Sequence, residues 1–288
     1  MPSNHPSTLT HTAPPLAPRV VVVTGASSGI GQAIALEFAR NNCAVIVHGR
    51  NNLVGLSHTA EMCNSPLAVA ADLTKSESIY HLADAAFARF GYVDVWVHAA
   101  GADVLTGNAK QWSFETKLQR LLDLDLRAMA LLSRTVANRQ VQQKSPQKSL
   151  PSMIHIGWDQ ANSGFEGDSG LYFCPVKAAV NAFSKSLAKS YAPNLRVNCL
   201  LPGWIQTQWG QHTSPEWNSR AQNESLLGRW GTPEDVAKVA VAISMGDAEF
   251  INAQDIPVNG GWHGGPPSVR SNLSMDSIPK RSPFPESP

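Results

Sequence analysis

The sequence has few cysteines and almost no net charge. Its four cysteines, Cys43, Cys63, Cys174 and Cys199, are scattered, and no two of them form a CxxC pair. This spacing argues against a disulfide framework or a zinc site, so we expect reduced thiols, no bound metal and a cytoplasmic protein. The net charge of +1 gives no electrostatic reason to bind nucleic acid or an acidic membrane surface.

Long apolar runs are also missing. No stretch approaches the roughly 18 consecutive apolar residues of a membrane span, and the N-terminal segment lacks the apolar core of a signal peptide. We therefore expect no membrane partner. Residues 1–18 are rich in Pro, Ser, Thr and His, and residues 262–288 are rich in Pro and Ser. We expect two disordered tails around a single domain, residues 19–261.

Hydrophobic residues make up 43% of the chain, which is ample for one packed core. Short apolar runs alternate with longer segments of helical periodicity. The runs expected to form strands are 19–25, 43–50, 67–73, 94–101, 151–158, 195–203 and 255–261, and long helices are expected at 30–42, 117–139 and 176–192. Apolar strands that alternate with helices indicate parallel βαβ units. The expected fold class is α/β, a doubly wound (Rossmann) parallel seven-stranded sheet with helices on both faces.

The segment TGASSGIG stands where the first expected strand meets the first helix. Glycines in this place let the backbone approach a phosphate, and the N–H groups at the helix N-terminus face the pyrophosphate of a dinucleotide. The residues expected to hold it are Gly25, Ser27, Ser28, Gly29, Ile30 and Gly31. A glycine-rich turn alone is weak evidence, but its position in the first βα turn supports the assignment.

The end of the second expected strand indicates which dinucleotide is bound. An acid here would bind the ribose 2′-hydroxyl of NAD, but Gly49 occupies the place and Arg50 follows. A guanidinium suits a 2′-phosphate, so NADP(H) is favoured over NAD(H), unless Arg50 is only a solvated surface residue. Asp72, followed by Leu73, ends the third expected strand and is placed to accept from the adenine amino group. A helix cap is the alternative role for Asp72.

Together these motifs resemble the short-chain dehydrogenase/reductase family, on its 3-oxoacyl-carrier-protein reductase branch. The resemblance covers nearly all of residues 19–261. The glycine loop matches TGxxxGxG, HAAG (98–101) matches the family's NNAG, and RVNCLLPGWIQT (196–207) matches its nicotinamide-binding segment. The resemblance implies further cofactor contacts from Ala99, Ala100, Gly101, Lys177, Pro202, Gly203, Ile205 and Thr207.

The resemblance also implies hydride transfer between a nicotinamide and a carbonyl or alcohol. In the family a tyrosine protonates the alkoxide, a serine holds it, a lysine lowers the pKa of the tyrosine, and an asparagine supports a water chain to the lysine. Only the lysine, Lys177, matches directly. The asparagine place falls on Asp125, which could still accept from Lys177 or could be a surface acid.

The serine is absent. Its place falls on Trp158 or Asp159. Trp158 offers only an indole N–H donor and could simply be a core aromatic. Asp159 could accept a hydrogen bond from a substrate hydroxyl, but an ionised carboxylate would repel an alkoxide. Ser163, farther along the chain, stays open as a substitute.

The tyrosine place depends on helical phase. Residues i and i+4 of a helix lie about 40° apart, and i and i+5 about 140° apart. Phe173 is four residues before Lys177, and Tyr172 is five residues before it, so regular geometry puts Phe173 in the tyrosine place. Pro175 complicates this reading, because a helix that began at Pro175 would leave Tyr172 on an irregular lead-in, free to swing toward Lys177.

If the usual acid is lost, general acid catalysis worth typically 10²–10⁴-fold goes with it. Glu166, Asp168 and Ser169 stand just upstream as substitute donors, unless this segment is only an exposed turn. The segment 208–230 lies where the family carries its substrate lid. The tryptophans that could line this lid with aromatic rings are Trp204, Trp209 and Trp217, although tryptophan also packs cores.

Three hypotheses follow from these observations. The first is an NADP-dependent oxidoreductase acting on a small carbonyl or alcohol with a rearranged acid and serine pair. The second is an NADP-binding protein of the same fold without turnover, acting as a sensor or oligomer subunit. The third is a different reaction, such as dehydration or epimerisation. The family resemblance further implies a homodimer or homotetramer paired through helix 117–139 and the helix near Pro175.

Overall fold

The computed structural model of the protein describes residues 17–65, 67–207, 210 and 213–261. Apart from residues 17 and 18, the two expected tails lie outside these ranges. Seven parallel strands form one sheet in the order β3-β2-β1-β4-β5-β6-β7. Their bounds are β1 Val20–Thr24, β2 Ala44–Gly49, β3 Leu67–Ala70, β4 Val95–His98, β5 Ser152–Ile156, β6 Arg196–Pro202 and β7 Asp255–Val258. This arrangement confirms the expected seven-stranded parallel α/β sheet.

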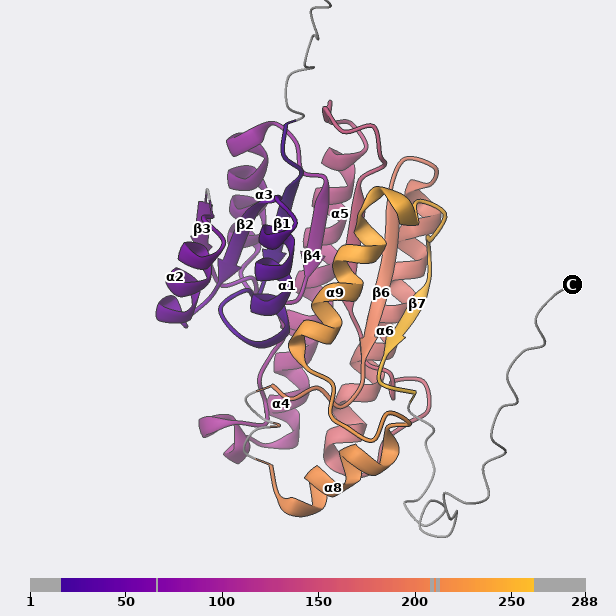
Figure 1. Ribbon diagram of the computed structural model, residues 1–288. Helices are drawn as coiled ribbons and strands as arrows, with labels where there is room; N and C mark the ends of the chain where they lie inside the picture. Colours follow the sequence, from indigo (N-terminus) through magenta and orange to yellow (C-terminus); the bar gives the residue numbers. More distant parts are fainter. Residues whose placement is uncertain (1–16, 66, 208–209, 211–212, 262–288) are drawn as a thin grey trace, which may run out of the picture.

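Helices cover both faces of the sheet, as Figure 1 shows. Helices α1, α2 and α9 pack on one face, and α3, α5 and α6 pack on the other. The α-helices are α1 Gly29–Arg40, α2 Leu53–Met62, α3 Ser76–Phe90, α4 Phe114–Leu121, α5 Met129–Gln140, α6 Gly167–Tyr191, α8 Pro215–Glu224 and α9 Pro233–Ser244. Further helical segments within the described ranges are η1 Gly107–Gln111, η2 Leu122–Ala128 and η3 Gly246–Ala248. Helices α4 and α8 lie beyond the carboxyl ends of the strands.

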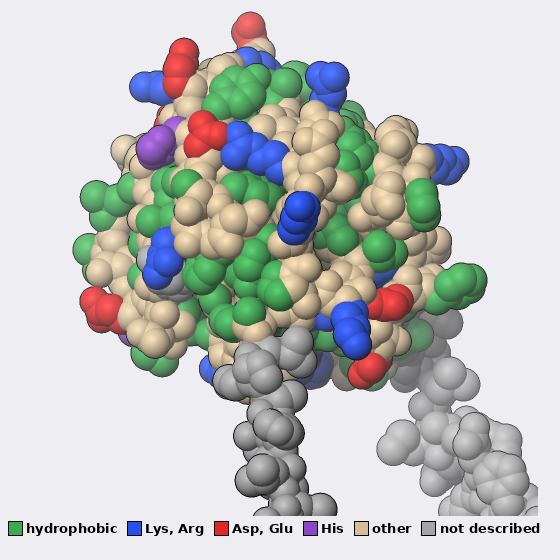
Figure 2. Space-filling view, turned by 90° about the horizontal axis from the view of Figure 1, so that it is seen from above, with side chains coloured by type: hydrophobic (Ala, Val, Ile, Leu, Met, Phe, Trp, Pro, Cys, Tyr) green, Lys and Arg blue, Asp and Glu red, His purple; other side chains and the backbone are tan. Residues whose placement is uncertain are grey.

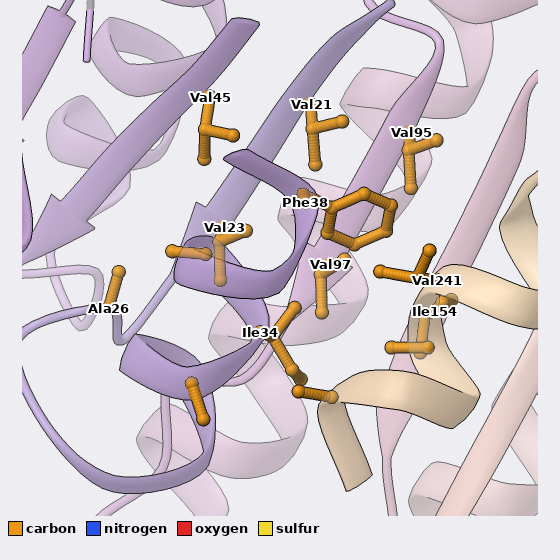
Figure 3. Close-up of a cluster of buried hydrophobic side chains, with 14 of the residues drawn as sticks. Val21, Val23, Ala26, Ile34, Phe38, Val45, Val95, Val97, Ile154 and Val241 are labelled. Carbon is orange, nitrogen blue, oxygen red and sulfur yellow. The ribbon is translucent and has the colours of Figure 1, made fainter. Parts of the chain in front are cut away.

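The core has two halves because the central strands are buried on both sides. All five residues of β1 are buried, and alternate side chains of a strand point to opposite faces. Val21 and Val23 therefore face α1, where Ile34 and Phe38 pack against them (Figure 3). Val20 and Val22 contribute to the other half, beneath α3 and α5. These packed layers give the carboxyl ends of the strands a rigid base.

Helix α6 corrects one sequence-based expectation. It begins at Gly167, with Glu166 as its N-cap residue, so Pro175 lies inside the helix and the helix does not start there. An internal proline removes one helical hydrogen bond and costs about 3 kcal/mol. Burial of Tyr172 and Val176 against the loop after β4 and against α4 offsets this cost.

The expected long helix at 117–139 is also not regular. Helix α4 runs into a seven-residue π-helical segment, η2, and then into α5. A π-helical segment holds an additional residue within a helix and is frequent at functional sites. Asp125 lies in this segment and is buried.

The end of the molecule seen from above carries charged side chains of both signs, spread over the face without a large patch of one sign (Figure 2). None of the helices that the structure describes is long and apolar enough to cross a membrane.

Candidate functional site

A cavity of about 870 Å³ is bordered by the segments that follow β1, β2, β3, β4, β5 and β6. In a parallel sheet this carboxyl edge is where ligands bind. Most of the residues expected from the sequence line it, namely Gly25, Ser27, Ser28, Gly29, Ile30, Gly31, Arg50, Leu73, Ala99, Ala100, Gly101, Asp125, Phe173, Lys177, Pro202, Gly203, Ile205 and Thr207. Three do not, although the structure describes them: Asp72, Asp159 and Tyr172.

The glycines of the loop before α1 have separate tasks. A Cβ on Gly31 would collide with the carbonyl oxygen of Gly25, and a Cβ on Gly25 would lie 2.7 Å from the Ala100 nitrogen. These two glycines therefore let the turn pack against α1 and against the loop after β4. Gly29, at φ +55°, would direct a Cβ only toward Thr207, at 3.8 Å. The backbone at Gly29 is thus open to a ligand in the cavity.

The N-terminus of α1 has no side chain of the protein in the place that a bound anion would take. The Ser28 side chain does not cap the helix, and the first turn contains no acidic residue. The first N–H groups of a helix and its dipole both favour negative charge. The turn and the start of α1 together form a site suited to a pyrophosphate.

The end of β2 is tied to this loop by Asn52, a residue that the sequence analysis did not single out. The Asn52 side chain donates to the Ser27 carbonyl oxygen at 3.0 Å and accepts from the Gly55 N–H at 3.0 Å, capping α2. An asparagine directly before an apolar helix is the signal that could have identified it. Arg50 is exposed at the cavity, next to Gly49, which is buried against Ser27.

The helix-cap alternative for Asp72 is wrong, because α3 has Lys75 as its N-cap residue and no side-chain cap bond. The Asp72 Oδ1 accepts from the Thr74 N–H at 3.1 Å and from the Thr74 hydroxyl at 2.8 Å. Desolvation acts to raise the pKa of Asp72, but the Thr74 hydrogen bonds and the charges of Arg50 and Lys75 outweigh it, and the pKa is lowered. A bond from Asp72 to adenine stays a prediction.

Lys177 forms a buried ion pair with Asp125. The Lys177 Nζ lies 2.9 Å from the Asp125 Oδ2, and the two side chains are 15% and 2% exposed. Lys177 also donates to the Ile156 carbonyl oxygen at 3.2 Å. The Asp125 Oδ1 accepts from the Ala102 N–H at 2.7 Å, which ties the loop after β4 to η2. Asp125 is therefore not a surface acid, which was the alternative expectation.

Phe173 lines the cavity together with Lys177, one helical turn away, and Tyr172 does not. Tyr172 is 3% exposed and packs with Val104 and Leu121. Desolvation, followed by the charge of Asp168, raises the pKa of its hydroxyl. The alternative in which Tyr172 swings toward Lys177 is wrong for this structure, because α6 is already helical at Tyr172 and fixes its side chain on another face.

Trp158 lines the cavity at the expected serine place, whereas Asp159 is turned away from it. The Asp159 Oδ2 accepts from the Asn259 amide at 3.1 Å. A Cβ on Gly203 would lie 2.9 Å from the same oxygen. Burial, with a further contribution from the charge of Glu224, raises the pKa of Asp159 to about 6. The prediction of Asp159 as a substrate contact is therefore not supported by its position.

The residues expected as substitute proton donors differ in whether they reach the cavity. Ser163 and Asp168 are exposed and do not line the cavity. Glu166 pairs with Arg220, whose hydrogen bond lowers the pKa of the carboxyl. Glu166 is therefore not an acid of raised pKa. Only Ser169 reaches the cavity.

Comparisons with known proteins agree with this geometry. The family model described as enoyl-(acyl carrier protein) reductase matches residues 25–263. A 3beta-hydroxysteroid dehydrogenase 1 from Eggerthella lenta is 31% identical, over 84% of this chain and 93% of its own length.

The chain belongs to the short-chain dehydrogenase/reductase family. A 3-oxoacyl-[acyl-carrier-protein] reductase from Chlamydia pneumoniae is 28% identical, over 84% of this chain and 95% of its own length, in agreement with the expected branch. The solved Pseudomonas aeruginosa RhlG/NADP active-site complex has a TM-score of 0.75 and 25% identity, and the match covers 85% of this chain and 96% of that one.

For this family member, the nucleotide end of the cavity fits a nicotinamide dinucleotide. The open backbone at Gly29 and the uncapped start of α1 leave room and donors for a pyrophosphate. Lys177 and residues of the segment 202–207 line the same cavity, where the nicotinamide would lie. When bound, the dinucleotide would supply or accept a hydride.

Among the residues that the structure describes, five aromatic rings line the other end of the cavity, those of Trp158, Phe165, Phe173, Trp204 and Trp217. Phe165, not identified from the sequence, is central to them: its ring centroid lies 5.5 Å from Trp158, 6.1 Å from Trp204 and 6.0 Å from Trp217. Trp158 in turn lies 6.1 Å from Phe173. Trp209, also expected in the lid, lies outside the described residues. We call these five rings the aromatic box.

A buried network of histidines lies beneath the site and was also not expected from the sequence. The Ser133 hydroxyl lies 3.0 Å from His98 Nε2 and 2.8 Å from His155 Nε2. His155 Nδ1 contacts the Ser184 hydroxyl at 2.7 Å. Burial lowers the pKa of His155 to about 3 and that of His98 well below its usual value. Both imidazoles are therefore neutral parts of the core, and histidine within an apolar strand was the available signal.

Proposed function

We propose that this protein is an NADP(H)-dependent oxidoreductase that transfers a hydride between the nicotinamide and a small substrate, with non-standard groups at the acid and serine places. The observation that carries the proposal is a single cavity lined by the glycine loop, Lys177 and the segment 202–207. The loop supports pyrophosphate binding, and Lys177 with the segment supports placement of the nicotinamide end. The relatives named above, a dehydrogenase and a reductase, support the reaction class.

A preference for NADP(H) over NAD(H) is supported by Arg50. It lines the cavity directly after β2, where Gly49 leaves no acid to bind a 2′-hydroxyl. A guanidinium can bind a phosphate in a bidentate manner. The related RhlG structure is a complex with NADP.

A second candidate function is dinucleotide binding without turnover. It is favoured by Phe173 and Trp158, because neither side chain can protonate an alkoxide at the places next to Lys177. The two candidates agree on the nucleotide end of the cavity and differ only in what happens to the substrate.

The deciding experiment has two parts. First, NADPH and NADH are titrated against the purified protein by fluorescence, and we expect NADPH to bind more tightly. If NADPH does not bind, both candidate functions fail. Second, NADPH oxidation is followed with a panel of carbonyl and C=N compounds. Turnover of any of them supports the oxidoreductase, and NADPH binding with no turnover supports the second candidate.

Two variants show which residue matters next to Lys177. Tyr172→Phe removes a hydroxyl that is buried away from the cavity, so we expect turnover to stay within about twofold of wild type. Phe173→Tyr places a hydroxyl four residues before Lys177, and we expect carbonyl reduction to rise, toward the 10²–10⁴-fold typical of a general acid. A loss of turnover in Tyr172→Phe would contradict this assignment.

Two further features belong to the proposal. Leu171 on α6 and Phe114 on α4 are exposed, and they support pairing of two copies through these helices to give a dimer or tetramer. Sedimentation of wild type and of Leu171→Glu would measure the oligomeric state.

Four unpaired, buried cysteines support a cytoplasmic location, because such thiols stay reduced in that compartment.

A further inference from the structure

The aromatic box lines the substrate end of the cavity, and the face of an aromatic ring attracts positive charge. A cation over an aromatic face within about 6 Å of the ring centroid is stabilised by the ring quadrupole. One cation already uses this property: the Arg220 guanidinium carbon lies 4.7 Å from the Phe165 centroid, 5.1 Å from Trp217 and 5.8 Å from Trp204. Arg220 is itself held by two carboxylates, Glu166 and Glu224.

The charged side chains that line the cavity also suit a cation at this end. Apart from Arg50 at the nucleotide end, they are Asp103, Asp125 and Lys177, two negative groups and one positive group, hence a formal charge of −1. The 2.9 Å ion pair with Asp125 neutralises Lys177, so the ammonium group does not repel a cationic ligand. The neutral asparagine that the family has at this place could not have this effect.

The lack of a hydroxyl at the family's tyrosine and serine places next to Lys177 points to the same class of ligand. No tyrosine among the described residues lines the cavity, and Phe173 and Trp158 hold the two places where a hydroxyl would serve a carbonyl. Reduction of a carbonyl needs a proton for the oxygen. Reduction of an iminium does not: a C–H bond forms at carbon, the C=N π pair moves onto nitrogen, and the positive charge of the nitrogen disappears.

We infer that the aromatic box binds a flat, cationic C=N compound, an iminium ion, and that this class is the substrate from which the proposed hydride transfer needs no proton donor. The inference rests on the proposed function for its redox step, with a dihydronicotinamide dinucleotide as the reductant. Its binding step rests only on residues of this chain. Phe173 and Trp158 serve as apolar walls for the ring system, and Asp125 keeps the centre of the cavity from being positive.

Binding is tested with N-methyl-3,4-dihydroisoquinolinium, a permanent cation, and with 1-tetralone, a neutral ketone of similar size. Both are titrated by calorimetry against the protein alone and against the protein saturated with NADP⁺. We expect the cation to bind at least about tenfold more tightly than the ketone. Equal affinities, or tighter binding of the ketone, would overturn the inference.

Variants separate a charge effect from a loss of structure. Asp125→Asn should weaken binding of the cation about three- to tenfold and leave binding of 1-tetralone unchanged, because it uncovers the Lys177 charge. Trp158→Leu should also reduce the ratio of the two affinities. Trp112→Leu removes an exposed tryptophan outside the cavity and should leave the ratio as in wild type. An unchanged ratio in Asp125→Asn would contradict the role of this carboxylate.

The redox step is followed through NADPH absorbance with the same two compounds. We expect the iminium to be consumed at a rate that changes less than about threefold between about pH 6 and about pH 9, since no proton is transferred. If NADPH binds and 1-tetralone is consumed instead, the proposed function stands and the iminium inference fails. If NADPH itself does not bind, the proposed function fails. The ratio of the affinities for the iminium cation and 1-tetralone, measured by calorimetry, still decides whether the aromatic box selects a cation.

Discussion

The two ends of the cavity differ in how far they keep the family pattern. At the nucleotide end, the glycine loop, the 99–101 segment and the 202–207 segment keep the motifs and line the cavity as expected. At the substrate end, only Lys177 keeps its family identity, and Asp125, Trp158 and Phe173 replace an amide and two hydroxyls. Both ends are built on the same buried strands, so the difference lies in the chemistry of the side chains rather than in the scaffold.

This contrast indicates that backbone packing limits the residues allowed at the nucleotide end, whereas side-chain chemistry determines the substrate end. The nucleotide end works mainly through backbone, where a single Cβ on Gly31 would collide with Gly25, so few substitutions fit. The substrate end works through side chains, and a change of side chain alters its charge and proton chemistry without disturbing the fold. Experiments that disturb each end separately can test this separation.

The largest effect is expected from Asp125→Ala. It would leave the Lys177 charge and the Ala102 N–H without their partner, and breaking a buried ion pair in this way costs about 3–5 kcal/mol. Urea unfolding measures the loss. Asp125→Asn keeps an acceptor for the Ala102 N–H and should cost clearly less. Equal stability of Asp125→Ala and wild type would show that the pair does not hold the substrate end together.

Gly31→Ala should disturb the nucleotide end. The added methyl group would be forced against the Gly25 carbonyl oxygen, and overpacking of this kind typically costs about 1–3 kcal/mol. We also expect NADPH affinity to fall at least about tenfold, measured by fluorescence titration. Gly246→Ala, where the nearest atom to the added Cβ is the end of the Arg19 side chain at 3.8 Å, is the matched control.

Lowering the pH should destabilise the folded protein through the buried histidines beneath the two ends of the cavity. Burial lowers the pKa of His48, next to the glycine loop, to about 4, and that of His155 to about 3. In the unfolded chain both would titrate near the ordinary value of about 6.5. The unfolded state therefore binds more protons below about pH 6.5, and stability falls as the pH falls toward these lowered pKa values, by about 1.4 kcal/mol per histidine and per pH unit.

Urea unfolding at several pH values between about 5 and about 7 measures this slope. His98→Asn removes one of the buried imidazoles. It should reduce the slope of stability against pH by about 1.4 kcal/mol per pH unit, the contribution of one proton. His58→Gln, on the exposed side of α2, is the control for replacing a histidine outside the core. A wild-type stability that does not vary over this range would contradict the neutral, buried state of the three histidines.

The smallest effect is expected from Arg50→Ala at the nucleotide end. Arg50 is exposed, and its loss should weaken NADPH binding about five- to tenfold, or about 1 kcal/mol, and leave NADH binding unchanged. Arg40→Ala removes the same charge from the far end of α1 and serves as the control. Equal losses for the two dinucleotides would remove the argument for a 2′-phosphate partner.

Much of the fold could be predicted because it depends on long, regular patterns. Most of the strands are apolar runs that end at or near a glycine, and the glycine loop occupies the first βα turn as expected. The start of α6 could not be predicted, because proline is locally unfavourable inside a helix, and only tertiary burial of Tyr172 and Val176 reverses that preference.

At the site, helical phase correctly indicated that Phe173 and not Tyr172 shares a face with Lys177. The position of Asp159 was wrong because its side-chain direction depends on Asn259, one hundred residues away. Phe165 and the histidine network were missed for the same reason: their partners come from distant segments, and no short motif describes them.

The π-helical segment before α5 bears on the chain's tolerance of insertions and deletions. Because η2 holds one residue more than a regular helix needs, losing a single residue there would let α4 and α5 join as one continuous α-helix. Because a π segment turns less per residue than an α-helix, this relaxation would leave α4 and α5 nearly in phase, and only the side chains of η2 itself, Asp125 among them, would change direction relative to Lys177. The charge state of the active site is thus linked to the length of one helix, so a deletion that spares every side chain in the cavity could still change what the protein binds.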